Sequence, residues 1–585
     1  MNYKKMVILK TPIQSLLLLT FACVFFIQCS PTSEPQTRYI PMEATMVGVI
    51  DLKQLYFKAD FKQIQSTAGF KKWQTTVLSQ NKDLGSILLD NLQNPFASGI
   101  NFERKVFVFD YPTHHLINTN RGILVALNSA SKFEQMVRKW SKKLVIQTGK
   151  EGFKWVELEE NLALGWNKKV AMLMISAPDF KMNSVGKPLG ASTYLKQFFS
   201  FPAEKSLSKN RNFQAFIRKD NDLALWYNLE AVKQQMTVAL KTSNYSKNDQ
   251  QVLDEIFNFS DAYIHYELNF EKGKVRATTH YDLNDHLKKF YNKTYGKTLS
   301  PELLAKLHDH KPIGFLGFSW NFSGLYDWLK RVEDVEQQFE KTAKSMNFTS
   351  QELLDALQGE LMLAVTGYEK FEVKEKGSPY GDYLTEMLKK HKVGEKKLED
   401  FRKRLDEIPA KVRVKPAPEL VAVLSVKNSQ VAQQLLKLLG QYTKLTPRKS
   451  YHKFQWMELT MYVAVRANHL VVSNQEKLVQ NFWSKQQKPV PMVGLYKEAT
   501  QCTGFGYFNF NFDEYNQSTQ QHIKQQVGTK FGKLQEVLNL FDHIKARNKG
   551  FDAEIELVMS NKKENSLTTL LNGVFNDAAM IVLAE

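Results

Sequence analysis

Residues 153–158 read Phe-Lys-Trp-Val-Glu-Leu, and residues 454–459 read Phe-Gln-Trp-Met-Glu-Leu. Four of the six positions are identical at an offset of 301 residues. One short match would be weak evidence, but the segments on both sides repeat as well, and an internal repeat decides the architecture of a chain. We therefore predict two copies of one structural plan.

Each copy is predicted to run strand, helix, strand, hairpin. The first has an apolar strand at 123–127, and the second has one at 421–426. Helices follow at about 131–140 and from about 429, each with apolar residues three and four positions apart. Asn167 and Asn468 fall where hairpin turns are expected. We expect residues 122–176 and 420–474 to superpose, with Trp155 and Trp456 in equivalent places.

The copies extend in both directions. The openings 46–55 and 314–325 both read as a strand running into a helix. On the other side, residues 262–281 alternate as an antiparallel hairpin, and we expect 553–559 and 567–571 to pair in the same way. The prediction is an α+β chain of two duplicated lobes, 39–300 and 301–585, each an antiparallel sheet packed with helices.

The second lobe carries a charged insertion at 368–418 that the first lobe lacks. Residues 377–381 open it as a loop, residues 389–404 have helical composition, and three prolines, Pro409, Pro416 and Pro418, close it. A helix docked through its apolar side would present a basic side to an anionic lipid or an acidic glycan. The alternative is a solvated arm without a partner. The basic residues are Lys389, Lys390, Lys392, Lys396, Lys397, Arg402, Lys403 and Arg404.

The N-terminus follows the plan of a secretory signal. Three lysines precede a mostly apolar stretch at 13–27, which is shorter than the roughly 20 residues of a membrane span. Cys29 and a polar tether, 29–38, come next. A cysteine in this position resembles the lipobox of bacterial lipoproteins, so we predict a signal peptide at 1–28 and lipidation of Cys29. The alternatives are lipidation of Cys23, a signal peptide cut elsewhere, or an uncleaved anchor.

Charge and cysteine content limit the rest of the 585 residues. The formal net charge is +19, and removing Lys4, Lys5 and Lys10 leaves +16. Of the three cysteines only Cys502 remains beyond Cys29, so the mature chain has no intrachain disulfide, and we interpret Cys502 as a core residue. No nucleic-acid module is recognisable, and we do not expect nucleic acid as a partner.

Catalytic and metal-binding patterns are weak. The best metal candidate is His308-Asp309-His310, followed by His114-His115, and neither has an identifiable third ligand. Ser129 and Lys132 have the Ser-x-x-Lys spacing of some acylating enzymes, but Ser129 fits a helix cap better. The aromatic residues of the repeated motif would stack on a sugar or, as we prefer, fill the core: Phe153, Trp155, Phe454 and Trp456.

The segment that starts at Tyr39 carries a family resemblance. Ile40-Pro41, Ala44 and Ile50-Asp51-Leu52 resemble the opening of a domain-of-unknown-function family of outer-membrane lipoproteins from Gram-negative bacteria. The resemblance implies anchoring at the outer membrane, with the periplasmic or surface side undecided, and Ser30 after the cysteine resembles outer-membrane sorting. It implies no catalytic residue and no cofactor.

Three functional hypotheses follow. The one we favour is a non-enzymatic lipoprotein that binds or scaffolds at the envelope, with the membrane, an anionic lipid, an acidic glycan or an envelope protein as partner. The second is an envelope hydrolase or transferase with a site assembled from distant residues. The third is a carrier of lipid or peptide between the lobes.

Overall fold

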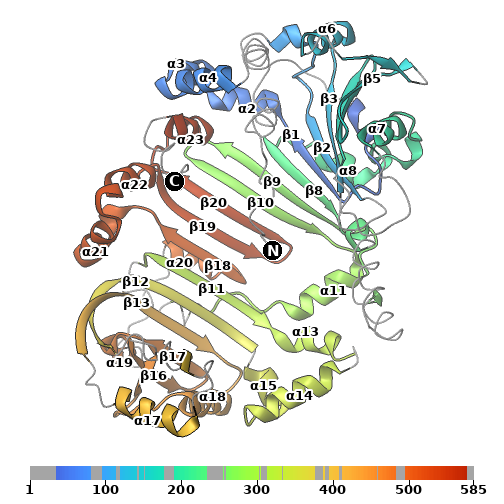
Figure 1. Cartoon of the computed structure of the whole chain (residues 1–585). Helices are drawn as coiled ribbons and strands as arrows, with labels where there is room; N and C mark the ends of the chain where they lie inside the picture. Colours follow the sequence, from blue (N-terminus) through green and yellow to red (C-terminus); the bar gives the residue numbers. More distant parts are fainter. Residues whose placement is uncertain are drawn as a thin grey trace. The chain divides into compact units, whose positions relative to one another are not determined.

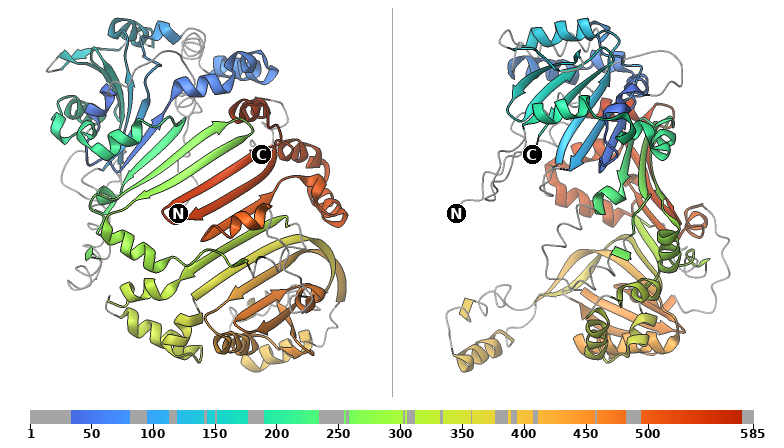
Figure 2. Two further views of the ribbon diagram at one scale, coloured as in Figure 1. Left: turned by 180° about the vertical axis from the view of Figure 1, so that it is seen from behind. Right: turned by 90° about the vertical axis from the view of Figure 1, so that its right-hand side faces the viewer.

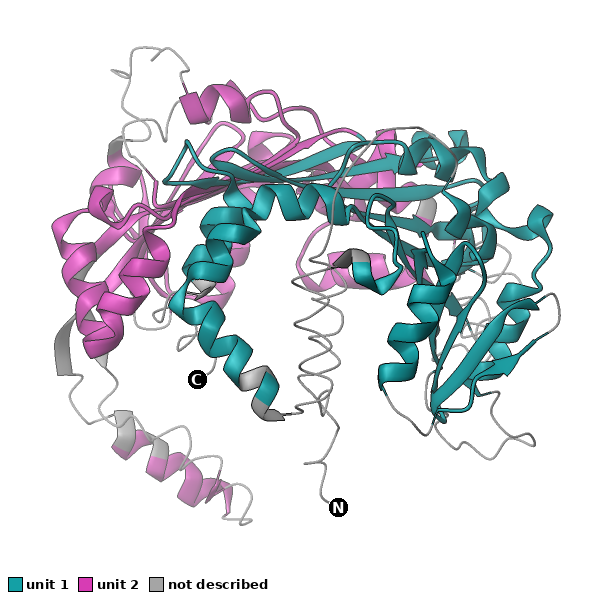
Figure 3. Cartoon of the chain, turned by 90° about the horizontal axis from the view of Figure 1, so that it is seen from above, with its two compact units in different colours: residues 1–289, 551–585 teal, residues 290–550 magenta. Residues whose placement is uncertain are grey.

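The computed structural model describes residues 34–575, with gaps at 81–94, 113–118, 141–143, 150–151, 177–189, 234–253, 256–257, 302–303, 305–311, 332–333, 357, 376–386, 389–393, 407–410, 457–458 and 482–493. It combines helices with antiparallel sheet, which confirms the α+β class (Figure 1). Two compact units divide the chain, 1–289 with 551–585 and 290–550 (Figure 3). Residues 551–585 therefore group with unit 1, although the sequence placed them in the second lobe.

Unit 1 is built on one antiparallel arrangement of strands. The order of neighbours is β4-β5-β6-β7-β3-β2-β1-β8-β9-β10-β20. The strands are β1 (Met46–Ile50), β2 (Val106–Pro112), β3 (Thr119–Ala126), β4 (Gln147–Thr148), β5 (Lys154–Glu159), β6 (Leu162–Trp166), β7 (Val170–Ile175), β8 (Leu223–Asn228), β9 (Tyr263–Glu271), β10 (Lys274–Asp282) and β20 (Asp552–Met559). The helices are α2 (Leu52–Ala59), α3 (Phe61–Ser66), α4 (Ala68–Gln80), α6 (Ala130–Trp140), α7 (Ala191–Phe199), α8 (Arg211–Ile217) and α23 (Ser566–Phe575).

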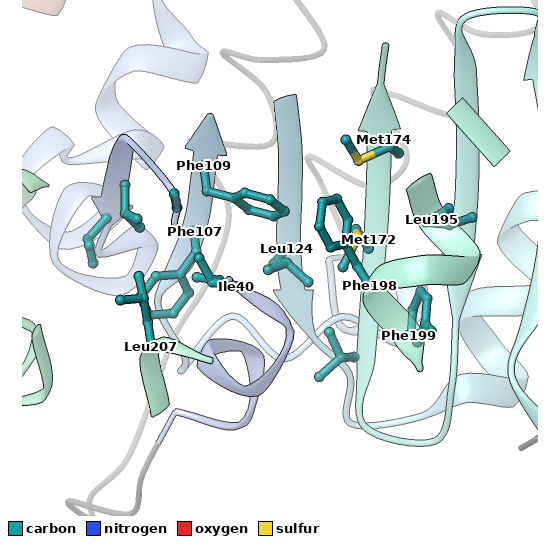
Figure 4. Packing of buried hydrophobic residues seen from close by; sticks show 14 of the residues in the cluster. Ile40, Phe107, Phe109, Leu124, Met172, Met174, Leu195, Phe198, Phe199 and Leu207 are labelled. Atoms are coloured by element: carbon teal, nitrogen blue, oxygen red, sulfur yellow. The ribbon is translucent and has the colours of Figure 1, made fainter. Parts of the chain in front are cut away.

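Hydrophobic clusters cover both faces of the first half of the unit 1 sheet. On one face Phe109 and Leu124 meet Phe198 of α7, and Figure 4 shows these side chains pointing into one space. On the other face Phe133 of α6 packs edge-on against Trp166, with ring centroids 5.8 Å apart. The strands at this end are apolar on both sides because helices cover both sides.

Unit 2 has the neighbour order β14-β15-β16-β17-β13-β12-β11-β18-β19, again antiparallel. Its strands are β11 (Gly314–Asn321), β12 (Gln358–Glu375), β13 (Lys411–Ser425), β14 (Thr446–Pro447), β15 (His452–Trp456), β16 (Leu459–Arg466), β17 (His469–Ser473), β18 (Gly504–Asn509) and β19 (Phe541–Lys549). Its helices are α13 (Phe322–Leu329), α14 (Val335–Ser345), α15 (Ser350–Ala356), α17 (Glu395–Asp406), α18 (Ser429–Tyr442), α19 (Glu476–Asn481), α20 (Gly494–Ala499), α21 (Gln517–Val527) and α22 (Phe531–Leu538). Helix α11 (Asp285–Thr294) contains the unit boundary.

The order of pairing repeats from unit 1 to unit 2. Strand β3 pairs with β7 as β13 pairs with β17, and the turns after β6 and β16 lie at Asn167 and Asn468 as expected. The motif that suggested the repeat is nevertheless out of register. Trp155 faces Gly165 and is 5% exposed, whereas Trp456 faces Leu459 beside the turn and is 53% exposed. Duplication stays a prediction, and the equivalence of Trp155 and Trp456 is wrong.

Two further expectations are corrected. Residues 567–571 lie in helix α23, not in a returning strand, because Asn565 Oδ1 accepts the Leu567 N–H and starts a helix that packs on α2 and α3. Pro416 and Pro418 lie inside β13 instead of closing the insertion. Before Val421 this strand pairs only with β12, so a proline without an N–H is tolerated on its open side.

Candidate functional site

The most distinctive surface of unit 2 lies on the central strands β12, β11 and β18. Leu316 and Phe318 of β11 point to one side, together with Leu363 of β12, which is opposite Leu316. Phe508 of β18 joins them, opposite Gly314. These four side chains are 37–47% exposed, and we call them the unit 2 open face.

The other side of the same strands is core. Phe315, Met362 and Phe505 are almost fully buried there, together with Tyr496 of α20 and with Cys502, which follows that helix. An antiparallel sheet with one covered side ordinarily presents polar side chains on its other side. Strands that are apolar on both sides, with one side covered, mark a binding surface.

Helix α18 covers one end of this side of the sheet. Leu424 of β13 packs against the cluster that contains its Val431, and Leu470 and Val472 of β17 pack against the cluster that contains its Leu436. The helix covers this side of the sheet only as far as β13. The neighbouring strand β12, where Leu361 is opposite Leu424, already belongs to the strands that carry the unit 2 open face. This side of the sheet is thus part of a packed core beneath α18, and beyond the helix its apolar side chains are accessible.

Three glycines leave parts of the unit 2 open face without side chains. Gly314, Gly504 and Gly506 stand on the same side as Leu316 and Phe508. A Cβ at Gly314 would lie 3.4 Å from the Phe508 ring, and one at Gly506 would lie 3.5 Å from the Cβ of Ala546. Glycine in a strand often marks a place where another molecule approaches the backbone closely.

Backbone pairing decides what kind of ligand this surface can take. Strand β11 is paired with β12 and β18, β12 with β11 and β13, and β18 with β11 and β19. A peptide that binds by strand addition needs an unpaired strand edge. The open face itself also carries no charged side chain. A ligand must therefore be held by apolar contact.

The basic residues predicted in the insertion are only partly placed. Lys389, Lys390 and Lys392 lie outside the described residues, and the Arg402 side chain is not described. Four others lie exposed on α17, beyond the paired ribbon of β12 and β13 (Figure 2): Lys396, Lys397, Lys403 and Arg404. The Lys403 ammonium is 3.8 Å from the Glu399 carboxylate.

The other site candidates from the sequence are capping or core residues, or they lie outside the described residues. The Ser129 hydroxyl accepts the Lys132 N–H at 3.3 Å at the start of α6, as a cap does. Phe153, Trp155 and Phe454 are buried, as is Cys502, whose thiol pKa is raised by burial. Cys29, His114, His115, His308 and His310 lie outside the described residues. Within the described ranges, no three or more His, Cys, Asp or Glu side chains gather as metal ligands.

One carboxylate cluster bears on the hydrolase hypothesis. In unit 1 the fully buried Asp222 accepts hydrogen bonds from Lys58 Nζ at 2.8 Å and from the Phe270 N–H at 2.7 Å. Asp51 caps α2 by accepting the Gln54 N–H, and burial raises its pKa. Burial also raises the pKa of Glu34, to about 7. Asp51 and Asp222 hold helices and strands together, so their burial has a structural reason and does not require a catalytic role.

The open face was not found from the sequence, although a signal existed. Residues 314–320 and 361–365 place apolar residues at both odd and even positions. That pattern predicts a strand covered on both sides. It can also mean a strand covered on one side and waiting for a ligand on the other, and only the placement of the helices separates the two.

Comparisons with known proteins identify a family and little else. A family model described as Domain of unknown function (DUF4836) matches residues 36–567. No curated protein matches the chain. Two crystal forms of TP0453, III and I, are 8% and 10% identical, with TM-scores of 0.23 and 0.21, and each alignment covers 44% of this chain and 82% or 81% of that one. TM-scores this low support no conclusion. Among the helices that the structure describes, none has the length and apolar character needed to span a membrane.

Proposed function

The chain belongs to the family described as Domain of unknown function (DUF4836), and we propose that it is a non-enzymatic, lipid-anchored envelope protein that binds the acyl chains of lipids on the unit 2 open face. The observation that carries the proposal is a sheet that is apolar on both sides and covered on one. Fully burying a Leu or Phe side chain contributes about 1.5–3 kcal/mol. Covering the remaining exposed part of four such side chains would contribute roughly 2–5 kcal/mol.

Acyl chains fit better than the other occupants that the sequence left open. A glycan needs hydrogen-bonding groups, and an acidic one needs basic groups, but the unit 2 open face is aliphatic and aromatic. A peptide strand has no free edge to pair with. An anchor on Cys29 would place the protein where lipids are its neighbours.

A direct binding measurement tests this function. The chain from Ser30 onward keeps every described residue and can be purified without its predicted anchor. We expect native mass spectrometry to detect palmitate bound to it after incubation, and a soluble hexose offered at the same concentration to stay unbound. Equal binding of both compounds, or of neither, would contradict the proposal.

Lipidation of Cys29 is the second part of the proposal and is supported by the apolar stretch and polar tether around it. Cys29→Ala should abolish palmitate labelling in a Gram-negative host and leave the chain soluble or as a precursor, because the only acylated sulfur is gone. Cys23→Ala is the matched control and should be labelled and fractionate like the wild type. A labelled, membrane-bound Cys29→Ala protein would assign the anchor elsewhere.

The basic arm, α17, is proposed to meet anionic lipid headgroups. A basic residue near an anionic surface contributes about 1 kcal/mol, so the double change Lys396→Glu and Lys397→Glu should weaken binding to phosphatidylglycerol vesicles about tenfold or more. Reversing the exposed Lys341 and Lys344 of α14 changes the net charge equally and should have little effect. Vesicle binding that survives in the arm variant, or that does not fall with added salt, would make α17 a solvated arm.

A further inference from the structure

Unit 2 has another exposed surface at the end of helix α18, where the chain enters the short hairpin of β14 and β15. The Thr443 hydroxyl donates to the Gln455 carbonyl oxygen at 3.0 Å, which holds the end of the helix beside the end of β15. Tyr442 precedes one of these residues and Trp456 follows the other, and they are 77% and 53% exposed. The hydrogen bond therefore keeps two exposed aromatic residues close together. We call residues 442–456 the basic hairpin.

The basic hairpin contains no acidic residue. Its charged side chains are three lysines and one arginine, and helix α18 before it adds Lys437 and no acid. Lys437 is exposed, as are three of the four others. Within the described part of the chain, no carboxylate forms an ion pair with any of them. The charge is therefore available to an anionic partner, and the hairpin residues that carry it are Lys444, Arg448, Lys449 and Lys453.

The basic hairpin is fixed to the unit 2 core, so its exposed side chains have defined positions. Phe454 is buried in one cluster with Leu436 of α18. The Arg448 N–H donates to the Tyr451 carbonyl oxygen at 2.8 Å and closes the turn. Phe454 and Trp456 are two positions apart in β15 and share one side of the strand, but the core covers only the first. Core packing accounts for Phe454 and not for Trp456.

The surface of an anionic lipid bilayer fits both the aromatic and the basic side chains. Tryptophan and tyrosine are enriched at the interface between headgroups and acyl chains, because their rings combine an apolar body with a polar end. Basic side chains beside them are attracted by lipid phosphates. An acidic glycan would match only the charges. Its hydroxyl groups also need acceptors, and the basic hairpin has no carboxylate to provide strong ones.

We propose that the basic hairpin contacts an anionic lipid bilayer, with Tyr442 and Trp456 in the headgroup region and the basic side chains on the lipid phosphates. The contact uses other residues than the unit 2 open face and α17. It needs neither an acyl chain at that face nor lipidation of Cys29, so it stands or falls separately from the proposed function. It turns this end of unit 2 toward the membrane surface.

Vesicle binding of the chain without its predicted anchor tests the proposal. Mixed phosphatidylglycerol and phosphatidylcholine vesicles should bind the wild type. Tyr442→Ala with Trp456→Ala should weaken this binding about tenfold or more, and so should Lys444→Glu with Lys449→Glu. Phe57→Ala, which removes an aromatic side chain that is 53% exposed on α2, should bind like the wild type, and the α14 reversal described above controls for charge. Unchanged binding in either hairpin variant, or equal binding to pure phosphatidylcholine, would overturn the proposal.

A dye on the basic hairpin reports whether it enters the bilayer. Cys502 is fully buried, so in the chain without Cys29 the substitution Tyr442→Cys provides an accessible thiol for a bimane dye. Mixed vesicles should shift the bimane emission to the blue because the dye leaves water, and the same dye at Phe57→Cys should not respond. Equal responses at both positions would overturn the proposal. A blue shift with polygalacturonate, a soluble acidic polysaccharide, and none with vesicles would overturn it too and assign the basic hairpin to acidic glycans.

Discussion

Replacing Leu316 and Phe508 with glutamine is expected to weaken palmitate binding at the unit 2 open face by about a hundredfold. The two side chains stand on neighbouring strands, β11 and β18, and each has more than 40% of its surface accessible to a ligand. The variant loses roughly 1 kcal/mol of apolar contact at each position and places two amides where no ligand group can hydrogen-bond them. The lost contact alone sums to about 2 kcal/mol, a factor of about thirty, and the two amides without partners raise the factor toward about one hundred.

A matched control comes from the same unit. Tyr442→Gln with Trp456→Gln also removes two exposed apolar side chains, but these lie on α18 and β15, away from the open face. Displacement of a fluorescent fatty acid measures both variants, and the melting temperature of each should stay close to that of the wild type. Equal affinity in the two variants would mean that general surface hydrophobicity, and not this face, binds the ligand.

Replacing Asp222 with alanine is expected to destabilise unit 1 by about 3–5 kcal/mol. Its carboxylate is fully buried and holds Lys58 of α2 against β8 and β9, and removal of one partner leaves the ammonium without its counter-charge. An exposed ion pair contributes far less, so Glu340→Ala, which removes the partner of Lys344 on α14, should cost under 1 kcal/mol.

Urea unfolding followed by tryptophan fluorescence measures the loss, since Trp155 and Trp226 are buried in unit 1. A second substitution supplies the decisive comparison. Lys58→Met in the Asp222→Ala background removes the unpaired charge and should recover part of the stability. A loss below 1 kcal/mol for Asp222→Ala, or no recovery in the double variant, would show that this pair does not hold unit 1 together.

Local patterns in the sequence predicted much of the fold. Helix α6 buries Phe133, Met136 and Val137 as their spacing requires, and the hairpin of β9 and β10 turns at Gly273. Short-range geometry decides such features, so a single sequence contains them. Leu567 to Leu571 failed as a strand because a five-residue apolar run fits either a strand or a helix, and here the cap at Asn565 decides.

The candidate site could not be predicted in the same way. Alternation tells which residues share a side of a strand, but whether Leu316 is core or surface depends on where α18 stops covering the sheet. The motif with Trp155 and Trp456 misled for a related reason. Identical letters at a constant offset do not fix register, which the turns and the facing strand determine.

Photo-crosslinking tests the central claim, that acyl chains lie on the unit 2 open face, most directly. A palmitate analogue with a diazirine on its chain would be bound to the chain from Ser30 onward, irradiated, and located by peptide mass spectrometry, with excess palmitate as competitor. We expect competitor-sensitive adducts on peptides that contain β11 or β18. Adducts confined to other segments, or adducts that palmitate does not displace, would contradict it.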